Sequence, residues 1–321
     1  MISRRRFIGF LAAGLMLVSR SSKAQQNKVF RIGLLLPGPE SPYQEAIIDS
    51  IRNVGYTEGK NLVVEYRAVA PEELPSAALD LVRLKVDLIY TIASSGVRAA
   101  VHATREIPIV AVDLETDPVA SGYASSLARP GGNLSGFFLD LPEFSAKRLE
   151  ILKEALPSIS GVTVLWDATL DRTPLSRMQA AARALKLRLV VVDVQATSDL
   201  EKAFQAASRR KHQAVMVMQS PTLDGYMGQI LRLGTTYRLP VSAVFGNFAT
   251  DGALISFGPN GPNMLQRSAT YVDRVLRGAK IGDLPIQRES KFDLIVNART
   301  AKSLGLTIAS SILFRADRVL R

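Results

Sequence analysis

The sequence predicts an α/β chain of two similar lobes, each built on a parallel sheet covered by helices. Three observations lead to this fold class. Apolar runs of strand length alternate with amphipathic helical segments along most of the chain. The strand runs are apolar throughout, which is typical of parallel strands buried on both faces. The alternation begins again near residue 149, so we expect two Rossmann-like lobes with a cleft between them.

The first half of the chain contains strands joined by helical segments. We expect strands at residues 29–36, 62–66, 86–92, 107–112 and 133–138, and helices at 41–54, 74–81 and 96–104. The first helix has clear boundary signals, because Ser41 is a suitable N-cap, Pro42 follows it and Gly55 ends the pattern. Tyr43 and Ile47 recur at helical spacing, which predicts that they lie on its buried face.

The second half repeats this plan and then adds further segments. Strands are expected at residues 162–166, 187–194, 213–220 and 240–245, and helices at 149–156, 173–185, from 198 onward and at 227–234. Strands at 252–260 and 292–297 and a helix at 265–276 come after both lobes have been built. The chain is therefore expected to cross between the lobes more than once, and several crossovers would form a hinge.

The N-terminus resembles an export signal. Arg4, Arg5 and Arg6 precede the apolar run "FIGFLAAGLMLVS", and "SSKAQQ" follows it, so residues 1–24 are expected to be cleaved after Ala24. The run is too short to span a bilayer comfortably, and no membrane insertion is expected once it is removed. "SRRRFI" also fits a twin-arginine signal, but an ordinary secretory signal explains it equally well. Either route leads to a periplasmic or other extracytoplasmic protein.

Composition excludes several classes of function. The chain has no cysteine, so it has neither a disulfide framework nor a lipid-anchored cysteine. Its net charge is +11, but five basic residues and no acids lie in the expected signal, which leaves +6 for the remainder. The other Lys and Arg residues are scattered and form no basic stripe with aromatic residues. Nucleic-acid binding is therefore not expected.

The clearest candidate site lies where the strand at 86–92 ends. Ser94, Ser95 and Gly96 follow it directly and precede a helix. Ligands of open parallel sheets bind at such strand ends, where a helix N-terminus favours a carboxylate or a phosphate. The two hydroxyl groups can donate hydrogen bonds, and glycine allows close approach of the backbone. Ser94 also fits the role of an N-cap, and the two roles are compatible.

Other strand ends supply further candidates. Asp117 belongs to an acidic cluster with Asp113 and Glu115 after the strand at 107–112, where an acid could meet a ligand ammonium, although "DP" is also a common turn opener. The candidates in the second lobe are Asp167 beside Trp166, Ser220 beside Gln219, and Phe245 with Asn247. Trp166 fits either a stacking role against the ligand or a place in the core.

Catalytic, cofactor and metal motifs are missing from the sequence. His102 and His212 are the only histidines, and neither is spaced to pair with a serine or an acid. No nucleophile elbow, dinucleotide fingerprint or phosphate loop follows the expected strands. With two distant histidines and no cysteine, no metal site is expected. These observations favour a binding protein without a cofactor over an exported hydrolase.

The chain resembles the ABC transporter substrate-binding proteins, in particular the TrpX-like members that bind tryptophan or tyrosine. The resemblance rests on "NVGYTEGKNLVVEYR", "SLARPGGNLSGF", "KRLEILKEALPSISGVTVLWD", "GALISFGPN" and "KFDLIVNARTAKSLGLTI", in that order. It implies a type I periplasmic binding protein fold with three crossovers, in which one solute is held between the lobes and the closed form docks on an ABC permease of the inner membrane. Lobe 1 would comprise residues 29–142 and 258–282, and lobe 2 residues 143–257 and 283–321.

The resemblance says less about the site. It implies that Ser94, Ser95 and Gly96 and the "DPV" at Asp117 occupy family positions, and that "ARPGGNLSG" is a structural turn. Asp167 stands where family members have asparagine, so its charge either favours an ammonium-bearing ligand or lies away from the solute. The expected solute is a small molecule such as an amino acid or another carboxylate. A ligand-sensing partner of a membrane receptor would have the same sequence features.

Overall fold

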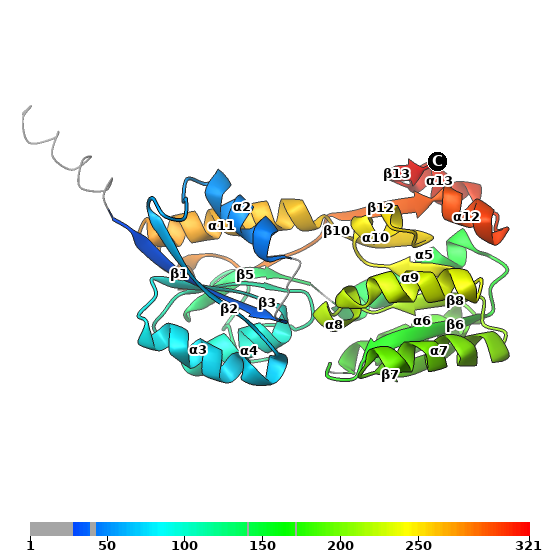
Figure 1. Cartoon of the computed structure of the whole chain (residues 1–321), viewed down its shortest axis with the longest axis horizontal. Helices are drawn as coiled ribbons and strands as arrows, with labels where there is room; N and C mark the ends of the chain where they lie inside the picture. The colour runs from blue at the N-terminus through cyan, green and yellow to red at the C-terminus, as the bar shows by residue number, and fades with distance from the viewer. Residues whose placement is uncertain (1–27, 39–42, 140, 171) are drawn as a thin grey trace, which may run out of the picture.

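The structure is a computed structural model that describes residues 28–38, 43–139, 141–170 and 172–321. It confirms two α/β lobes that lie side by side (Figure 1). The expected export signal at residues 1–24 and the expected helix start at Ser41 and Pro42 lie outside the described residues. Within the described part of the chain, no helix has the length and apolar character needed to cross a membrane.

The first lobe is built on a six-stranded sheet in the order β11-β5-β4-β3-β1-β2, counted over the described residues. Its strands are β1 (Phe30–Pro37), β2 (Leu62–Val69), β3 (Leu88–Ile92), β4 (Ile109–Asp113), β5 (Leu134–Phe138) and β11 (Gln287–Arg288). Neighbouring strands pair in parallel throughout. The helices of this lobe are α2 (Gln44–Asn53), α3 (Leu74–Arg83), α4 (Ala93–Ala103) and α11 (Gly261–Leu276), with 3-10 turns at Pro71–Glu73 and Ile281–Asp283. Helix α3 packs beside α4, and α11 packs beside α2.

The second lobe has a seven-stranded sheet in the order β13-β12-β10-β9-β8-β6-β7 within the described chain. Its strands are β6 (Gly161–Asp167), β7 (Arg188–Val194), β8 (Ala214–Val217), β9 (Val241–Ala243), β10 (Ile255–Pro259), β12 (Phe292–Asn297) and β13 (Arg318–Leu320). Only the β10–β12 pair among these described strands is antiparallel. The helices are α5 (Leu141–Ala155), α6 (Thr173–Ala184), α7 (Thr197–Arg209), α8 (Pro221–Gly225), α9 (Met227–Thr236), α10 (Gly246–Thr250), α12 (Ala298–Leu304) and α13 (Ser310–Arg315).

The described chain passes between the lobes between β5 and α5, between β10 and α11, and between β11 and β12 (Figure 1). Pairing of β11 with β5 keeps the chain in the first sheet as far as Arg288, beyond the boundary expected at residue 282. Two hydrogen bonds of Glu289 hold the last crossover against the first lobe. Its side chain accepts from Arg267 Nη1 of α11 at 2.8 Å, and its backbone amide donates to Phe138 O at 2.8 Å. Asn260 Nδ2 donates to Asp293 Oδ2 at 2.8 Å between the two neighbouring crossovers.

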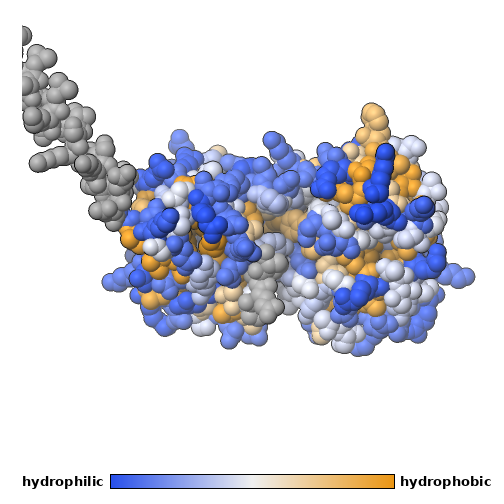
Figure 2. Space-filling model, turned by 45° about the horizontal axis from the view of Figure 1, so that its top comes forward, coloured by the Kyte–Doolittle hydropathy of each residue, from blue (hydrophilic) through white to orange (hydrophobic). Residues whose placement is uncertain are grey.

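Apolar packing holds both sheets in place, and one glycine shows how close that packing is. Gly136 lies inside β5 with φ +147°, and a Cβ added there would lie 1.9 Å from Ala111 O of the neighbouring strand. Only glycine fits this position. Figure 2 shows the two lobes as separate masses joined at a waist.

Candidate functional site

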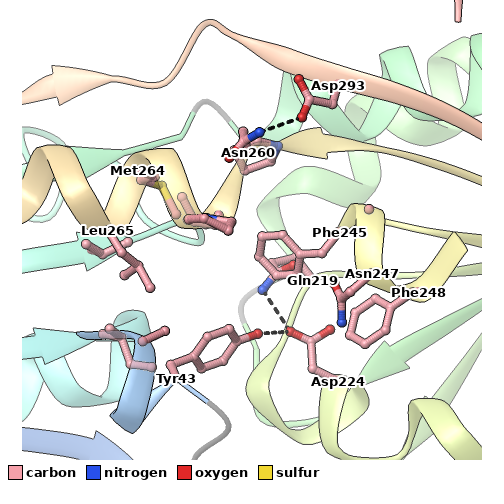
Figure 3. Close-up of a pocket in the computed structure, with 18 of the residues that line it drawn as sticks. Tyr43, Gln219, Asp224, Phe245, Asn247, Phe248, Asn260, Met264, Leu265 and Asp293 are labelled. Atoms are coloured by element: carbon pink, nitrogen blue, oxygen red, sulfur yellow. Dashed lines mark hydrogen bonds between the residues drawn. The ribbon is translucent and has the colours of Figure 1, made fainter. Parts of the chain in front are cut away.

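A cavity of about 460 Å³ lies between the lobes, at the carboxyl ends of strands from both sheets (Figure 3). Parallel sheets place their ligand sites at this edge, because loops and helix N-termini meet there. Ile92 and Leu114 line the cavity from the first lobe, and Phe245 and Phe248 line it from the second. Met264 of α11 covers the hinge side. The walls are therefore largely apolar and aromatic, as in most small-molecule sites.

A hydrogen-bonded cluster joins the two lobes across this cavity. Tyr43, just before α2, donates through its hydroxyl to Asp224 Oδ2 of α8 at 2.7 Å (Figure 3). Gln219 Nε2 donates to the same oxygen at 3.3 Å. The ring of Tyr43 also packs edge-on against Phe245, with 6.3 Å between ring centroids. These contacts exist only while the lobes are close together.

The charge of Asp224 is set by its buried position. Burial raises the pKa of Asp224 to about 7, although its bonds from Tyr43 and Gln219 and the charge of Arg148 oppose the rise. Burial also raises the pKa of Tyr43 well above its usual value, with the charge of Asp224 as the next cause. Tyr43 is therefore a hydrogen-bond donor at every physiological pH.

Arg148 is a buried cation in the second lobe. It lies on α5 with only 1% of its surface exposed, and burial lowers its pKa to about 9. Its Nη2 donates to Ser242 O at 3.3 Å, but Nε and Nη1 have no hydrogen-bond partner within the described chain. The charge of Asp224 is the main influence that favours the cationic form of Arg148.

Glu115 occupies the helix start that the sequence singled out. The backbone N–H of Ser94 donates to Glu115 Oε2 at 3.1 Å, and the Ser94 hydroxyl donates to the same oxygen. Burial and the neighbouring carboxylate of Asp113 raise the pKa of Glu115 to about 8. Burial likewise raises the pKa of Asp113 to about 6, against hydrogen bonds from Thr116. The Glu115 side chain thus caps the N-terminus of helix α4.

A second cavity of about 320 Å³ adjoins the first, and both are lined by Glu115 and Pro221. The predicted residues Ser94, Ser95 and Asp167 line this second cavity. Phe245 and Asn247 line the larger one. The structure therefore places these five candidates around two connected spaces between the lobes.

Three other candidates line neither cavity in the described structure. Gly96 lies inside α4, where a Cβ would be 2.3 Å from Thr91 Oγ1, so it is needed for packing. Asp117 caps its own turn by accepting from the amide of Val119 at 2.9 Å, and it forms an ion pair with Arg288 at 3.1 Å. Ser220 is fully buried and accepts from the amide of Leu223 at 3.0 Å, which caps α8.

Sequence reasoning missed the cluster that joins the lobes. Tyr43 was expected on the buried face of a helix, but it lies at the N-cap position of α2, where its side chain is free to reach the opposite lobe. Asp224 lies on the short helix α8, is buried, and accepts the hydrogen bond of Tyr43 from the opposite lobe. Of the acidic cluster, Glu115 lines both cavities, whereas the predicted Asp117 caps its own turn. Trp166 lies in the core with 1% exposure, so of its two expected roles it has the place in the core and not the stacking position against a ligand.

Neither histidine forms a catalytic pair in the described structure. His102 lines the second cavity, and His212 Nδ1 shares a 2.7 Å hydrogen bond with Thr163 Oγ1. No group of three or more histidine, aspartate or glutamate side chains is placed to hold a metal ion anywhere in the described ranges.

Two α/β lobes, three crossovers and a cavity lined from both sides define the fold of the type I periplasmic binding proteins. The chain belongs to the ABC transporter substrate binding protein family, whose family model matches residues 41–320. The expected family is thereby confirmed.

Individual relatives agree with this assignment. A tyrosine-binding protein of Clostridioides difficile (strain R20291) is 24% identical to the chain and covers 95% of it and 94% of its own length. A conserved domain protein from Vibrio cholerae superposes with a TM-score of 0.81 at 25% identity, covering 91% of this chain and 100% of its own. An ABC domain from Streptococcus pneumonia in complex with L-Trp has a TM-score of 0.80 at 21% identity, covering 91% and 99% of the two chains.

Proposed function

We propose that this chain is an extracytoplasmic solute-binding protein that captures one small molecule between its lobes and delivers it to an ABC permease in the inner membrane. The family assignment and the cavity between the lobes support this function. Residues 1–24 would direct export and then be removed, which leaves a periplasmic protein. The protein would return its solute unchanged, without a cofactor and without catalysis.

The solute is proposed to be a small amine-bearing molecule, amino acids included. The named ligands of two relatives, tyrosine and L-Trp, support this class. The cavity combines aromatic walls with buried carboxyl and amide groups, so it could enclose an apolar body and bind a polar end. Phe245 and Asn247 would contact the solute, while Ser94, Ser95 and Asp167 would act at the adjoining cavity.

One observation carries the proposal: Tyr43 and Asp224 belong to different lobes, line the same cavity and are hydrogen-bonded to each other. Contacts from both lobes are satisfied together only when the lobes are closed. A solute enclosed by both lobes would therefore stabilise the closed state.

A thermal-shift screen of the mature protein against a library of small metabolites tests this function. A ligand at 100 times its dissociation constant stabilises the folded state by about 2.7 kcal/mol, which gives a clear rise in melting temperature. The hit should then be taken up by cells that carry the gene and not by a deletion strain. Turnover of the hit by the purified protein, or a library without any hit, would count against a transport role.

A further inference from the structure

Two carboxyl groups from opposite lobes line the same cavity, and each has one oxygen without a hydrogen-bond partner in the described chain. Hydrogen bonds to Glu115 reach only Oε2, and those to Asp224 reach only Oδ2. The second oxygens, Glu115 Oε1 and Asp224 Oδ1, have no hydrogen-bond partner within the described residues. Neither of them is among the fully enclosed unpartnered atoms, so both are partly accessible. Both residues line the larger cavity, while Glu115 also lines the second cavity and Asp224 also lines a third cavity beside α9. The two groups lie close enough that the charge of each raises the pKa of Tyr43, after burial as the main cause.

The place where a solute carboxylate would be expected is already occupied. A helix N-terminus attracts an anion, but the amide and the hydroxyl of Ser94, the second residue of α4, already donate to Glu115. Of the described residues around the larger cavity, Arg318 is the only basic one, and it is exposed at the start of β13. Three acids, Glu115, Asp224 and Asp293, line the same space. The cavity is therefore poorly suited to the carboxylate of a solute.

The remaining walls suit an organic cation. The rings of Tyr43 and Phe245 meet edge-on, and Phe245 lies 6.2 Å from Phe248 between ring centroids. Aromatic faces attract ammonium groups, and apolar walls favour an apolar body.

We propose that the solute is a monocationic amine with an apolar or aromatic body and no free carboxylate, and that its ammonium group lies between Glu115 Oε1 and Asp224 Oδ1. This inference rests on the proposed function and narrows the class of solute from all amine-bearing molecules to those with a net positive charge. An ammonium group has three donors, so it can bond both carboxylates at once.

Proton linkage tests whether a cationic group of the solute lies between Glu115 and Asp224. The groups that influence the two carboxyls are Asp113, Asp167 and Ser94 for Glu115, and Tyr43, Gln219 and Arg148 for Asp224. With a pKa of about 8 for Glu115 and about 7 for Asp224, both carboxyls carry a proton part of the time near neutral pH. Binding of a cation favours their ionised forms and releases protons, whereas binding of an anion there would take protons up.

Calorimetry on the mature protein tests the proposal with matched probes. Tyramine is compared with L-tyrosine, and tryptamine with L-tryptophan, near neutral pH in two buffers of different ionisation enthalpy. We expect each amine to bind on the order of 10-fold or more tightly than its amino acid, because the only basic residue described around the larger cavity, Arg318, is exposed and the acids there would repel the solute carboxylate. The buffer dependence should show net release of protons.

Tighter binding of the amino acids, or uptake of protons on binding, overturns the cation inference and leaves the proposed function standing. If neither amine binds, the cation inference fails, whereas the proposed function is decided by the metabolite screen. These readouts use the unaltered chain, so they do not depend on whether a variant folds.

Variants then locate the ammonium group. Glu115→Gln and Asp224→Asn should each weaken amine binding on the order of 10- to 100-fold, as expected for loss of a charged hydrogen bond. Asp49→Asn on α2 and Glu150→Gln on α5 remove the same charge from exposed positions outside both cavities and should leave the affinity unchanged. Equal effects of cavity and control variants would contradict the assignment.

Discussion

Replacing Tyr43 by phenylalanine tests how the lobes are held together. The variant keeps the aromatic ring beside Phe245 and removes only the hydroxyl that donates to Asp224 Oδ2 at 2.7 Å. A hydrogen bond to a charged group contributes about 1.5–3 kcal/mol. Gln219 still donates to the same oxygen, so the lower end of that range applies. About 1.5 kcal/mol corresponds to roughly a tenfold shift from closed towards open lobes.

Small-angle scattering and calorimetry measure this effect. Without solute, Tyr43→Phe should have a larger radius of gyration than the unaltered protein, and saturating solute should restore the smaller value. Solute affinity should fall by up to about tenfold, because closure now costs more. Tyr66→Phe is the matched control, since it removes a tyrosine bond to Glu58 at 2.9 Å within the first lobe. If Tyr43→Phe matches the unaltered protein in both radius of gyration and solute affinity, the hydrogen bond between Tyr43 and Asp224 does not hold the lobes closed.

Three further changes test packing, the hinge and pH dependence. Gly136→Ala should lower the free energy of unfolding by at least about 2 kcal/mol in urea denaturation, because its methyl group would collide with Ala111 O. Gly225→Ala is the control, because its methyl group would meet open space and should not lower that free energy in the same way. Glu289→Ala should cost about 2 kcal/mol in the same assay and enlarge the solute-free protein in scattering, since it removes the buried partner of Arg267; an unchanged radius would exclude a role in the hinge. The pKa values of Glu115 and Asp224 are raised in the folded chain, so the folded chain binds protons more tightly than the unfolded chain between about pH 4 and 8. The free energy of unfolding without solute should therefore fall as the pH rises through that window. A melting temperature that does not change there would contradict those pKa values.

The strands could be predicted where burial on both faces makes them apolar throughout. Strands β1, β3 and β6 follow that pattern, and the structure has strands there. The pattern fails for β11 and β13, which are short, partly exposed and rich in arginine. It also misses α8 and α10, because five residues are too few to show a helical period.

The candidate site was predictable only where it depends on sheet topology. The rule that ligands bind at strand ends led to Phe245 and Asn247, which line the larger cavity. Tyr43 and Asp224 meet across the two lobes, and nothing in their own segments shows which residue the opposite lobe will supply. The helix start at Ser94 was located, but its capture by Glu115 depends on a loop conformation that spacing alone does not determine.

A crystal structure with the solute that gives the largest rise in melting temperature tests the central claim most directly. We expect density for the solute in the cavity between the lobes, in contact with Phe245 and with Asp224. Density elsewhere on the protein, with this cavity occupied only by water, would contradict it.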